Sequence, residues 1–384
     1  MSNSKTLIIM LGRPYQGEYQ KTDYKMPDGT LYKEKHFVGH SLFDWVKPEK
    51  LVVLGTPGSM WDELLRQIDD VNEELYLEVA EAVDANNTQQ ALLDRLSEHL
   101  SQLLSKEVVL KILTLKVDEE TQVEFVQQLG DVCDSGTELY MDITHGFRTL
   151  PLFALTAAFY LKKLKNIDIK AVYYAEFRPD EHCSVVHDLK GLITIMSGVS
   201  TLEKYDHSGD YGLLDELVNT DASKLKDAAF FERITNANKA SSKLKTFMDN
   251  WIPDATGKLF ERELLSRFKW SKRSAQHLRE LSLAREYLNR NDYLRAVFYG
   301  LEGLVSQHLY DQKIGDTGYE VRHEASNQLA ANDAYRKLRA IRNALAHGSD
   351  SAKSHHKEDV KKALASPKEM QKILSQLFNE LEIR

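Results

Sequence analysis

The chain has 384 residues, of which 42% are apolar and 28% are charged, and its formal net charge at pH 7 is −8. This length favours two domains over one, and the apolar share is large enough to build a core in each. The negative net charge argues against a protein that coats nucleic acid non-specifically, although it leaves room for a local basic groove.

Neither a disulfide framework nor a zinc site is expected from the cysteines. Cys133 and Cys183 are the two in the chain, and they form no CxxC spacing. The first apolar run, at residues 7–11, is too short for the core of a signal peptide or for a membrane span. We therefore expect a cytoplasmic protein without a metal, an organic cofactor or a membrane partner.

In the N-terminal half, strand-like and helix-like segments alternate. Short β-branched runs predict strands, and apolar residues spaced three and four apart predict helices. In chain order, the expected elements are strands at 5–12 and 50–54, helices at 60–83 and 88–104, a strand at 107–117, a helix at 119–133, a strand at 137–143, a helix at 150–165, and strands at 167–177 and 182–189. This alternation predicts a mostly parallel sheet with helices on both faces, as in a Rossmann-like α/β domain.

Three of the expected strands end in loops whose residues suit a phosphate group. The loops contain Gly12-Arg13, Gly55-Thr56 with Ser59, and Thr144-His145-Gly146 with Arg148. Ligands of parallel sheets bind at the carboxyl ends of the strands, where glycine permits close approach and hydroxyl or guanidinium groups donate hydrogen bonds. Each loop alone is equally consistent with a tight turn or a helix cap, but three such loops together favour a nucleotide site. Neither GxGxxG nor GxxxxGK[ST] is present, which argues against a dinucleotide-dependent dehydrogenase and a P-loop ATPase.

From about residue 200 the alternation stops, and helical periodicity continues along the rest of the sequence. This predicts an all-helical second domain. The segment AIRNALAHG, residues 340–348, is the part of it with possible chemistry. Asn343 and His347 are four positions apart and share a helix face, and the long side chain of Arg342 can reach the same patch.

This trio suits RNA cleavage. Arg342 can neutralise the scissile phosphate, His347 can act as general acid or base near neutral pH, and a 2′-hydroxyl is the natural nucleophile, so no metal is required. Gly348 is expected to end the helix. The alternative is that arginine and histidine are here only because the negative end of a helix dipole favours cations.

The two motifs resemble those of known families. The Asp142-Ile143-Thr144-His145-Gly146 run resembles the DxTHG signature of CRISPR-associated proteins. The Arg342-Asn343 pair followed by His347 resembles the RNxxxH form of the R-x(4–6)-H motif of HEPN ribonucleases. In this order they resemble the CARF–HEPN effector ribonucleases of type III CRISPR systems, where CARF denotes a CRISPR-associated Rossmann fold. The resemblance covers nearly the whole chain and implies a CARF-like sensing domain at 1–198 and an all-α region with a HEPN-like domain at 199–384.

The resemblance also implies a mechanism in antiviral defence. A cyclic oligoadenylate, commonly the tetra-adenylate, would bind across the twofold axis of a homodimer or higher oligomer and allosterically activate a composite HEPN site. That site would cut single-stranded RNA without a metal and leave a 2′,3′-cyclic phosphate. Messenger contacts would fall on Gly12, Arg13, Gly55, Thr56, Ser59, Thr144, His145, Gly146 and Arg148, and catalysis on Arg342, Asn343 and His347.

Two features depart from the pattern, and two other functions stay open. Arg13 stands where relatives often carry Thr or Ser, so it either grips phosphate or alters which ring size binds. Residues 60–106 exceed a simple crossover helix, and they either cover the ligand or extend the dimer. One alternative is a sensor with a non-catalytic helical output, although no basic recognition helix is evident after residue 200. The other is a sensor that also degrades its messenger, helped by His145 or Arg148.

Overall fold

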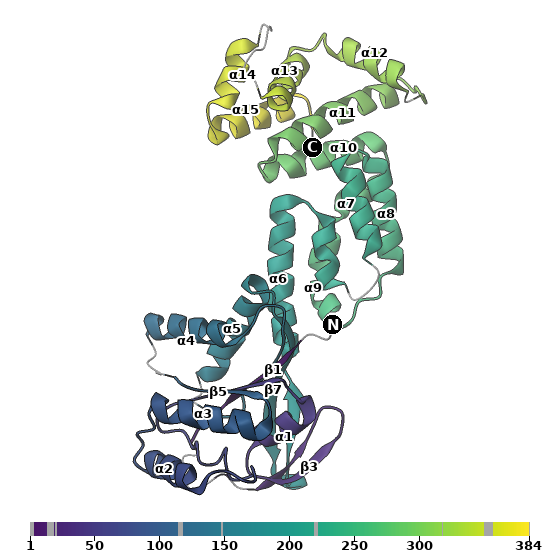
Figure 1. Cartoon of the computed structure of the whole chain (residues 1–384). Helices are drawn as coiled ribbons and strands as arrows, with labels where there is room; N and C mark the ends of the chain where they lie inside the picture. The colour runs from purple at the N-terminus through teal and green to yellow at the C-terminus, as the bar shows by residue number, and fades with distance from the viewer. Residues whose placement is uncertain are drawn as a thin grey trace. The chain divides into compact units, whose positions relative to one another are not determined.

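The computed structural model describes residues 4–13, 19, 21–113, 118–146, 149–218, 222–316, 318–348 and 356–383. The chain divides into two compact units, Met1–Met196 and Ser197–Arg384, whereas the sequence predicted a division between residues 198 and 199. The strands lie in the first unit, and the second unit is built of helices (Figure 1). The predicted fold class, an α/β sheet domain followed by an all-α domain, is therefore confirmed.

Within the described residues, the strands form one sheet of eight strands in the order β3-β2-β8-β7-β6-β1-β4-β5. The strands are β1 (Lys5–Met10), β2 (Thr22–Lys25), β3 (Leu31–Lys35), β4 (Lys50–Gly55), β5 (Glu107–Ile112), β6 (Glu138–Asp142), β7 (Asp168–Arg178) and β8 (Cys183–Asp188). The pairs from β7 through β6, β1 and β4 to β5 are all parallel, and so is β2 with β8. The pairs β2–β3 and β7–β8 are antiparallel.

Helices cover both faces of this sheet, because successive strand residues point to opposite sides. Leu7 and Ile9 of β1 share a core with α1 (Val38–Val46), α2 (Glu73–Asp84) and α3 (Gln90–Leu104). On the other face, buried residues of β1 such as Ile8 pack with side chains of three further helices. These are α4 (Glu119–Val132), α5 (Leu150–Leu164) and α6 (Lys190–Ser208).

The sequence-based elements differ from the structure in two places. Residues 61–67 form turns rather than helix, and α2 begins only at Glu73, where the Asn72 side chain accepts a hydrogen bond from the Leu75 N–H at 2.9 Å. Asparagine is a favoured helix N-cap, so the start of α2 after Asn72 could have been predicted from the sequence. The elements β2, β3 and α1 were not predicted; the two strands are short and contain no apolar run.

The strand order contains one switch point that bears on ligand binding. From β1 the chain proceeds to β4 and β5 on one side, and it later adds β6 and β7 on the other side. The order therefore reverses between β1 and β6, and in doubly wound sheets ligands bind at the carboxyl ends of the strands at such a switch point. Gly12 follows β1 and Gly146 follows β6, so both lie at this switch point, where doubly wound sheets form their ligand crevice.

Most helices of the second unit pack around one large apolar cluster, and a smaller cluster contains Val305, Leu309 and Ala325. Its helices after α6 are α7 (Ser223–Arg233), α8 (Ala237–Asn250), α9 (Ala255–Arg267), α10 (Gln276–Asn289), α11 (Tyr293–Asp311), α12 (Tyr319–Leu329), α13 (Asp333–His347), α14 (Lys357–Leu364) and α15 (Pro367–Glu380). Helix α13 ends at Gly348 with φ of 61°, as predicted. Over the described ranges, no helix combines the length and the apolar character needed to cross a membrane.

Candidate functional site

Hydrogen bonds hold the loops after β1 and β4 together. The Ser59 hydroxyl donates to the Leu11 carbonyl at 2.7 Å, and the Met60 N–H donates to the Gly12 carbonyl at 3.1 Å. Ser59 also accepts a hydrogen bond from the Thr56 N–H at 2.8 Å. These contacts fix two of the three predicted loops relative to each other at the carboxyl edge of the sheet.

The loops after β1 and β6 approach so closely that only glycine fits at the contact. A Cβ atom on Gly12 would lie 2.6 Å from the backbone nitrogen of Gly146, closer than real Cβ contacts. Gly146 has φ of 109°, a conformation that other residues rarely adopt, and a Cβ there would lie 2.6 Å from Leu150 Cδ1. Both glycines are thus explained by the meeting of the two backbones at the switch point.

Two hydroxyls that the sequence assigned to ligand contact are engaged within the protein. Ser59 is only 2% exposed and makes the bonds just described. The Thr144 hydroxyl donates to the Asp142 carboxylate and accepts from the Ala175 N–H of β7 at 2.9 Å. Because each hydroxyl has a single proton to donate, we infer that Ser59 and Thr144 hold the loops in place.

His145 packs against two aromatic rings that sequence reasoning missed. Its ring centroid is 4.8 Å from that of Tyr19 and 5.1 Å from that of Phe37. Burial lowers the pKa of His145 to about 4, so the imidazole is neutral at neutral pH. A neutral ring contributes stacking and hydrogen bonding rather than a charge for phosphate. Tyr19 and Phe37 lie in a segment without helical or strand periodicity, so no pattern pointed to them.

The remaining predicted contacts lie near the end of α2. The exposed Arg13 donates from Nη1 to the Val83 carbonyl at 3.4 Å. Gly55 is buried against the Trp61 ring, and Thr56 is half-buried. The turn between α2 and α3 also borders this loop, since Thr88 N–H donates to the Pro57 carbonyl at 3.1 Å. Arg148 lies outside the described residues.

The buried carboxyl of Asp142 should make the folding stability depend on pH. Burial raises its pKa to about 7, against the lowering effect of hydrogen bonds from Thr144. An unfolded aspartate ionises near pH 4, so between about pH 4 and 7 the folded state holds a proton that the unfolded state has released. Stability from this group therefore falls as pH rises through that window. We expect Asp142→Asn to be increasingly more stable relative to wild type as pH rises, in urea unfolding at several pH values.

The comparison isolates one carboxyl, because both proteins share every other titrating group. Asparagine keeps an oxygen that accepts the two Thr144 hydrogen bonds of Asp142 Oδ1. The Oδ2 atom has no hydrogen-bond partner in the described part of the chain, so the substitution removes no further contact there. A stability difference that stays constant from pH 4.5 to 8 would contradict the assignment of a raised pKa.

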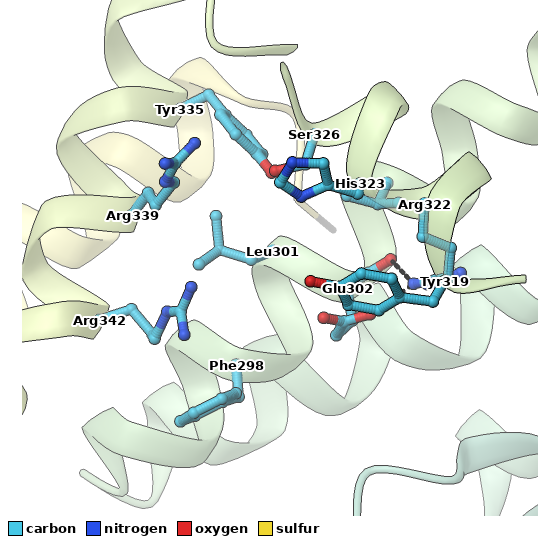
Figure 2. A pocket seen from close by; sticks show the side chains of 11 residues that line it. Phe298, Leu301, Glu302, Tyr319, Arg322, His323, Ser326, Tyr335, Arg339 and Arg342 are labelled. Carbon is cyan, nitrogen blue, oxygen red and sulfur yellow. Dashed lines mark hydrogen bonds and ion pairs between the residues drawn. The ribbon is translucent and has the colours of Figure 1, made fainter. Parts of the chain in front are cut away.

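The second candidate site lies on the C-terminal turns of α13. Asn343 and His347 are both exposed, as expected for residues four apart on one helix face. Arg342 is half-buried, with its guanidinium 5.4 Å from the centre of the Phe298 ring and its Nε without a hydrogen-bond partner among the described residues. Arg342 lines a cavity of about 380 Å³ between α11, α12 and α13, whereas Asn343 and His347 do not (Figure 2).

The carboxylate, imidazole and thiol side chains of the described ranges nowhere gather in a group of three or more that could hold a metal ion.

The first unit is similar to a domain of known proteins. Residues 6–179 match the family model of the CARF domain of CRISPR system endoribonuclease Csx1. CRISPR-associated protein MJ1674 of Methanocaldococcus jannaschii is 25% identical over 236 residues, which are 56% of this chain but only 37% of that relative's length. Among solved structures, Enterococcus italicus Csm6 bound to cyclic hexa-2'-fluoro-hexa-dAMP aligns with 98% of this chain and 95% of that chain, at 11% identity and a TM-score of 0.39.

Proposed function

We propose that this chain, whose residues 6–179 match the family model of the Csx1 CARF domain, is an endoribonuclease activated by a cyclic oligoadenylate. The family match and the curated relative support the resemblance to CRISPR-associated proteins with a CARF domain. The observation that carries the proposal is the exposed Asn343 and His347 beside Arg342, on one helix of a chain whose other unit matches this domain.

The crevice between β1 and β6 is our candidate for the messenger site. Gly12 and Gly146 let the two loops meet at this edge of the sheet, and the exposed backbone of Gly146 is open to a ligand. Arg13 supplies a positive charge for phosphate, and the neutral His145 suits contact with an adenine or a ribose. A cyclic ligand of repeated nucleotides presents equivalent groups to two protomers, which favours a symmetric dimer with tetra-adenylate as the first candidate.

The α13 residues can perform RNA cleavage by transesterification. The 2′-oxygen attacks the adjacent phosphorus and forms the O2′–P bond, while the P–O5′ bond breaks. The 2′-hydroxyl loses a proton and the departing 5′-oxygen gains one, leaving a 2′,3′-cyclic phosphate and a 5′-hydroxyl. His347 is placed as the group that transfers a proton, and Arg342 as the cation that stabilises the phosphate charge. Two protons must move, so pairing of two chains would supply one imidazole for each.

Coupling between the units requires that the messenger bind one state of the dimer more tightly than the other. An activator that shifts the site from mostly inactive to mostly active needs a differential affinity of about 5.5 kcal/mol. A ligand that bridges two equivalent loop sets can provide this difference, because both protomers contribute contacts in only one arrangement.

We expect cleavage of a fluorescent single-stranded RNA to continue undiminished in excess EDTA and to require one cyclic oligoadenylate. The reason is that the proposed nucleophile belongs to the RNA and the proposed charge partner is Arg342. The assay adds cyclic tri-, tetra- or hexa-adenylate separately and identifies the product ends by mass spectrometry. A linear oligoadenylate of the same length serves as the control.

Loss of cleavage in EDTA, restored by adding a divalent cation, would contradict the metal-independent mechanism. Clear binding of a ring without cleavage under any condition would instead favour a sensor with a non-catalytic helical output. In that case the RNxxxH residues would have only a structural role at the end of α13.

A further inference from the structure

We propose that the cavity beside Arg342 holds one nucleotide of the RNA substrate and is a positioning and specificity site formed within a single chain. The inference rests on the proposed nuclease function and deepens it. Arg339 would bind the scissile phosphate together with Arg342, and the Tyr319–His323 pair would stack on the adjoining base. Figure 2 shows the two arginines of α13 on one side of the cavity and the two rings of α12 on the other.

The charges around the cavity are unbalanced in favour of an anion. Arg339 and Arg342 are three positions apart on α13 and therefore project from the same face, where like charges repel. Within the described ranges, neither has a carboxylate at salt-bridge distance. The carboxylate of Glu302 is instead paired with Arg322, which also donates to the Ser306 hydroxyl at 3.2 Å. A phosphate between the two unpaired guanidiniums would relieve their repulsion and accept several hydrogen bonds.

The opposite wall offers an aromatic surface. Tyr319 is 78% exposed, although burying an aromatic ring is normally favourable. Its ring lies nearly parallel to that of His323, with 12° between the planes and 6.0 Å between the centroids. On the arginine side, Phe298 lies under the Arg342 guanidinium and helps to keep it at the cavity. Exposed rings of this kind are where proteins stack the bases of single-stranded nucleic acid.

The size and chemistry of the cavity favour an unpaired nucleotide. A volume of about 380 Å³ lies at the lower end of the range for small-molecule pockets. The base of a duplex is already stacked and paired, so it cannot reach a ring inside a cavity, whereas a splayed single-stranded base can. The hydroxyls of Ser326 and Tyr335, 2.9 Å apart at the wall, are polar groups that can discriminate between base edges.

The test measures RNA binding rather than cleavage, in a His347→Ala background that leaves the RNA intact. Full-length chain with its activating ring is titrated into a labelled ten-nucleotide single-stranded RNA at several salt concentrations. Arg339→Ala should weaken binding about tenfold and should reduce the slope of log affinity against log salt by about 0.7, the value for one phosphate contact on a single strand. Arg336→Ala is the matched control, because it removes the same charge from the same helix but does not line the cavity.

Stacking is tested separately. Tyr319→Ala should weaken RNA binding about fivefold or more without changing the salt slope, and Tyr319→Phe should restore it because the ring is kept. An RNA with one abasic position at the bound nucleotide should be insensitive to Tyr319→Ala. If these side chains had only structural roles, Arg339→Ala and Tyr319→Ala would not differ in their effect on the salt slope.

The outcomes separate this inference from the proposed function. Unchanged affinity and salt slope for Arg339→Ala would overturn the proposal that the cavity binds RNA, even if the wild type cleaves RNA. Weaker RNA binding by both Arg339→Ala and Tyr319→Ala would support the proposal that the cavity binds RNA. It would do so even if the wild type cleaved nothing and the nuclease proposal failed. Displacement of the labelled RNA by excess cyclic oligoadenylate would overturn the assignment of the pocket to RNA.

Discussion

Replacing His347 with alanine is expected to lower RNA cleavage by at least about a hundredfold, because a positioned general acid or base typically contributes a factor of 10² to 10⁴. His347 is exposed in the last turn of α13, so its removal leaves no buried cavity and should not unfold the chain. Cleavage is measured at saturating cyclic oligoadenylate. Binding of the ring is measured in parallel and should match the wild type.

His207→Ala is the matched control for this experiment. His207 is also an exposed histidine in the last turn of a helix of the second unit, in this case α6. His207 has the same side chain, exposure and helix-end position as His347, but no Arg-Asn pair precedes it. Normal cleavage by His347→Ala, or an equal loss in His207→Ala, would remove the catalytic assignment from α13.

Replacing Gly12 with alanine is expected to raise the ring concentration needed for half-maximal activation by about tenfold, which corresponds to about 1.4 kcal/mol. The added Cβ would lie 2.6 Å from Gly146 N and 2.9 Å from Gly146 Cα, both of them backbone atoms that cannot rotate away. The loops after β1 and β6 must therefore separate, which changes the crevice between them. Overpacking of this kind costs about 1–3 kcal/mol, so the melting temperature should also fall by a few degrees.

Two readouts distinguish a damaged messenger site from a damaged protein. At saturating ring, cleavage by Gly12→Ala should approach the wild-type rate, since α13 belongs to the other unit. Gly191→Ala is the control, because a Cβ there meets no atom within 4 Å and alanine favours the helix. Full activation of Gly12→Ala at the wild-type ring concentration would argue that the messenger binds elsewhere.

Sequence and structure agree best where local patterns are long and regular. The strand β1, the helices α4 and α5 and the Gly348 end of α13 fall where the spacing of apolar residues and the cap placed them. Agreement is poorest between residues 22 and 71. There β2 and β3 are short and contain no apolar run, and turns at residues 61–67 interrupt a segment whose apolar spacing is that of a helix, although β4 in the same range falls where it was predicted.

The candidate site residues also differ in how much of their role could be predicted from the sequence. The DxTHG and RNxxxH runs are contiguous, so they were visible in the sequence and led to the family resemblance. The inward role of Ser59 and Thr144 was not visible, because their partners Leu11 and Ala175 lie 48 and 31 positions away. Arg339 could have been noticed from its spacing of three from Arg342, but Tyr319 and Phe298 belong to other helices.

The sequence by itself determined the periodicities, the caps and the two motifs, since these depend on residues within one or two turns or strand steps of each other. The tertiary structure decided that β1 and β6 are neighbours, which brings Gly12 against Gly146 at the point where the strand order reverses. It also decided that Arg342 faces a cavity with Arg339 and Tyr319 while His347 faces outward. Contacts of this kind depend on how elements far apart in the chain pack, and no local pattern of residues encodes that packing.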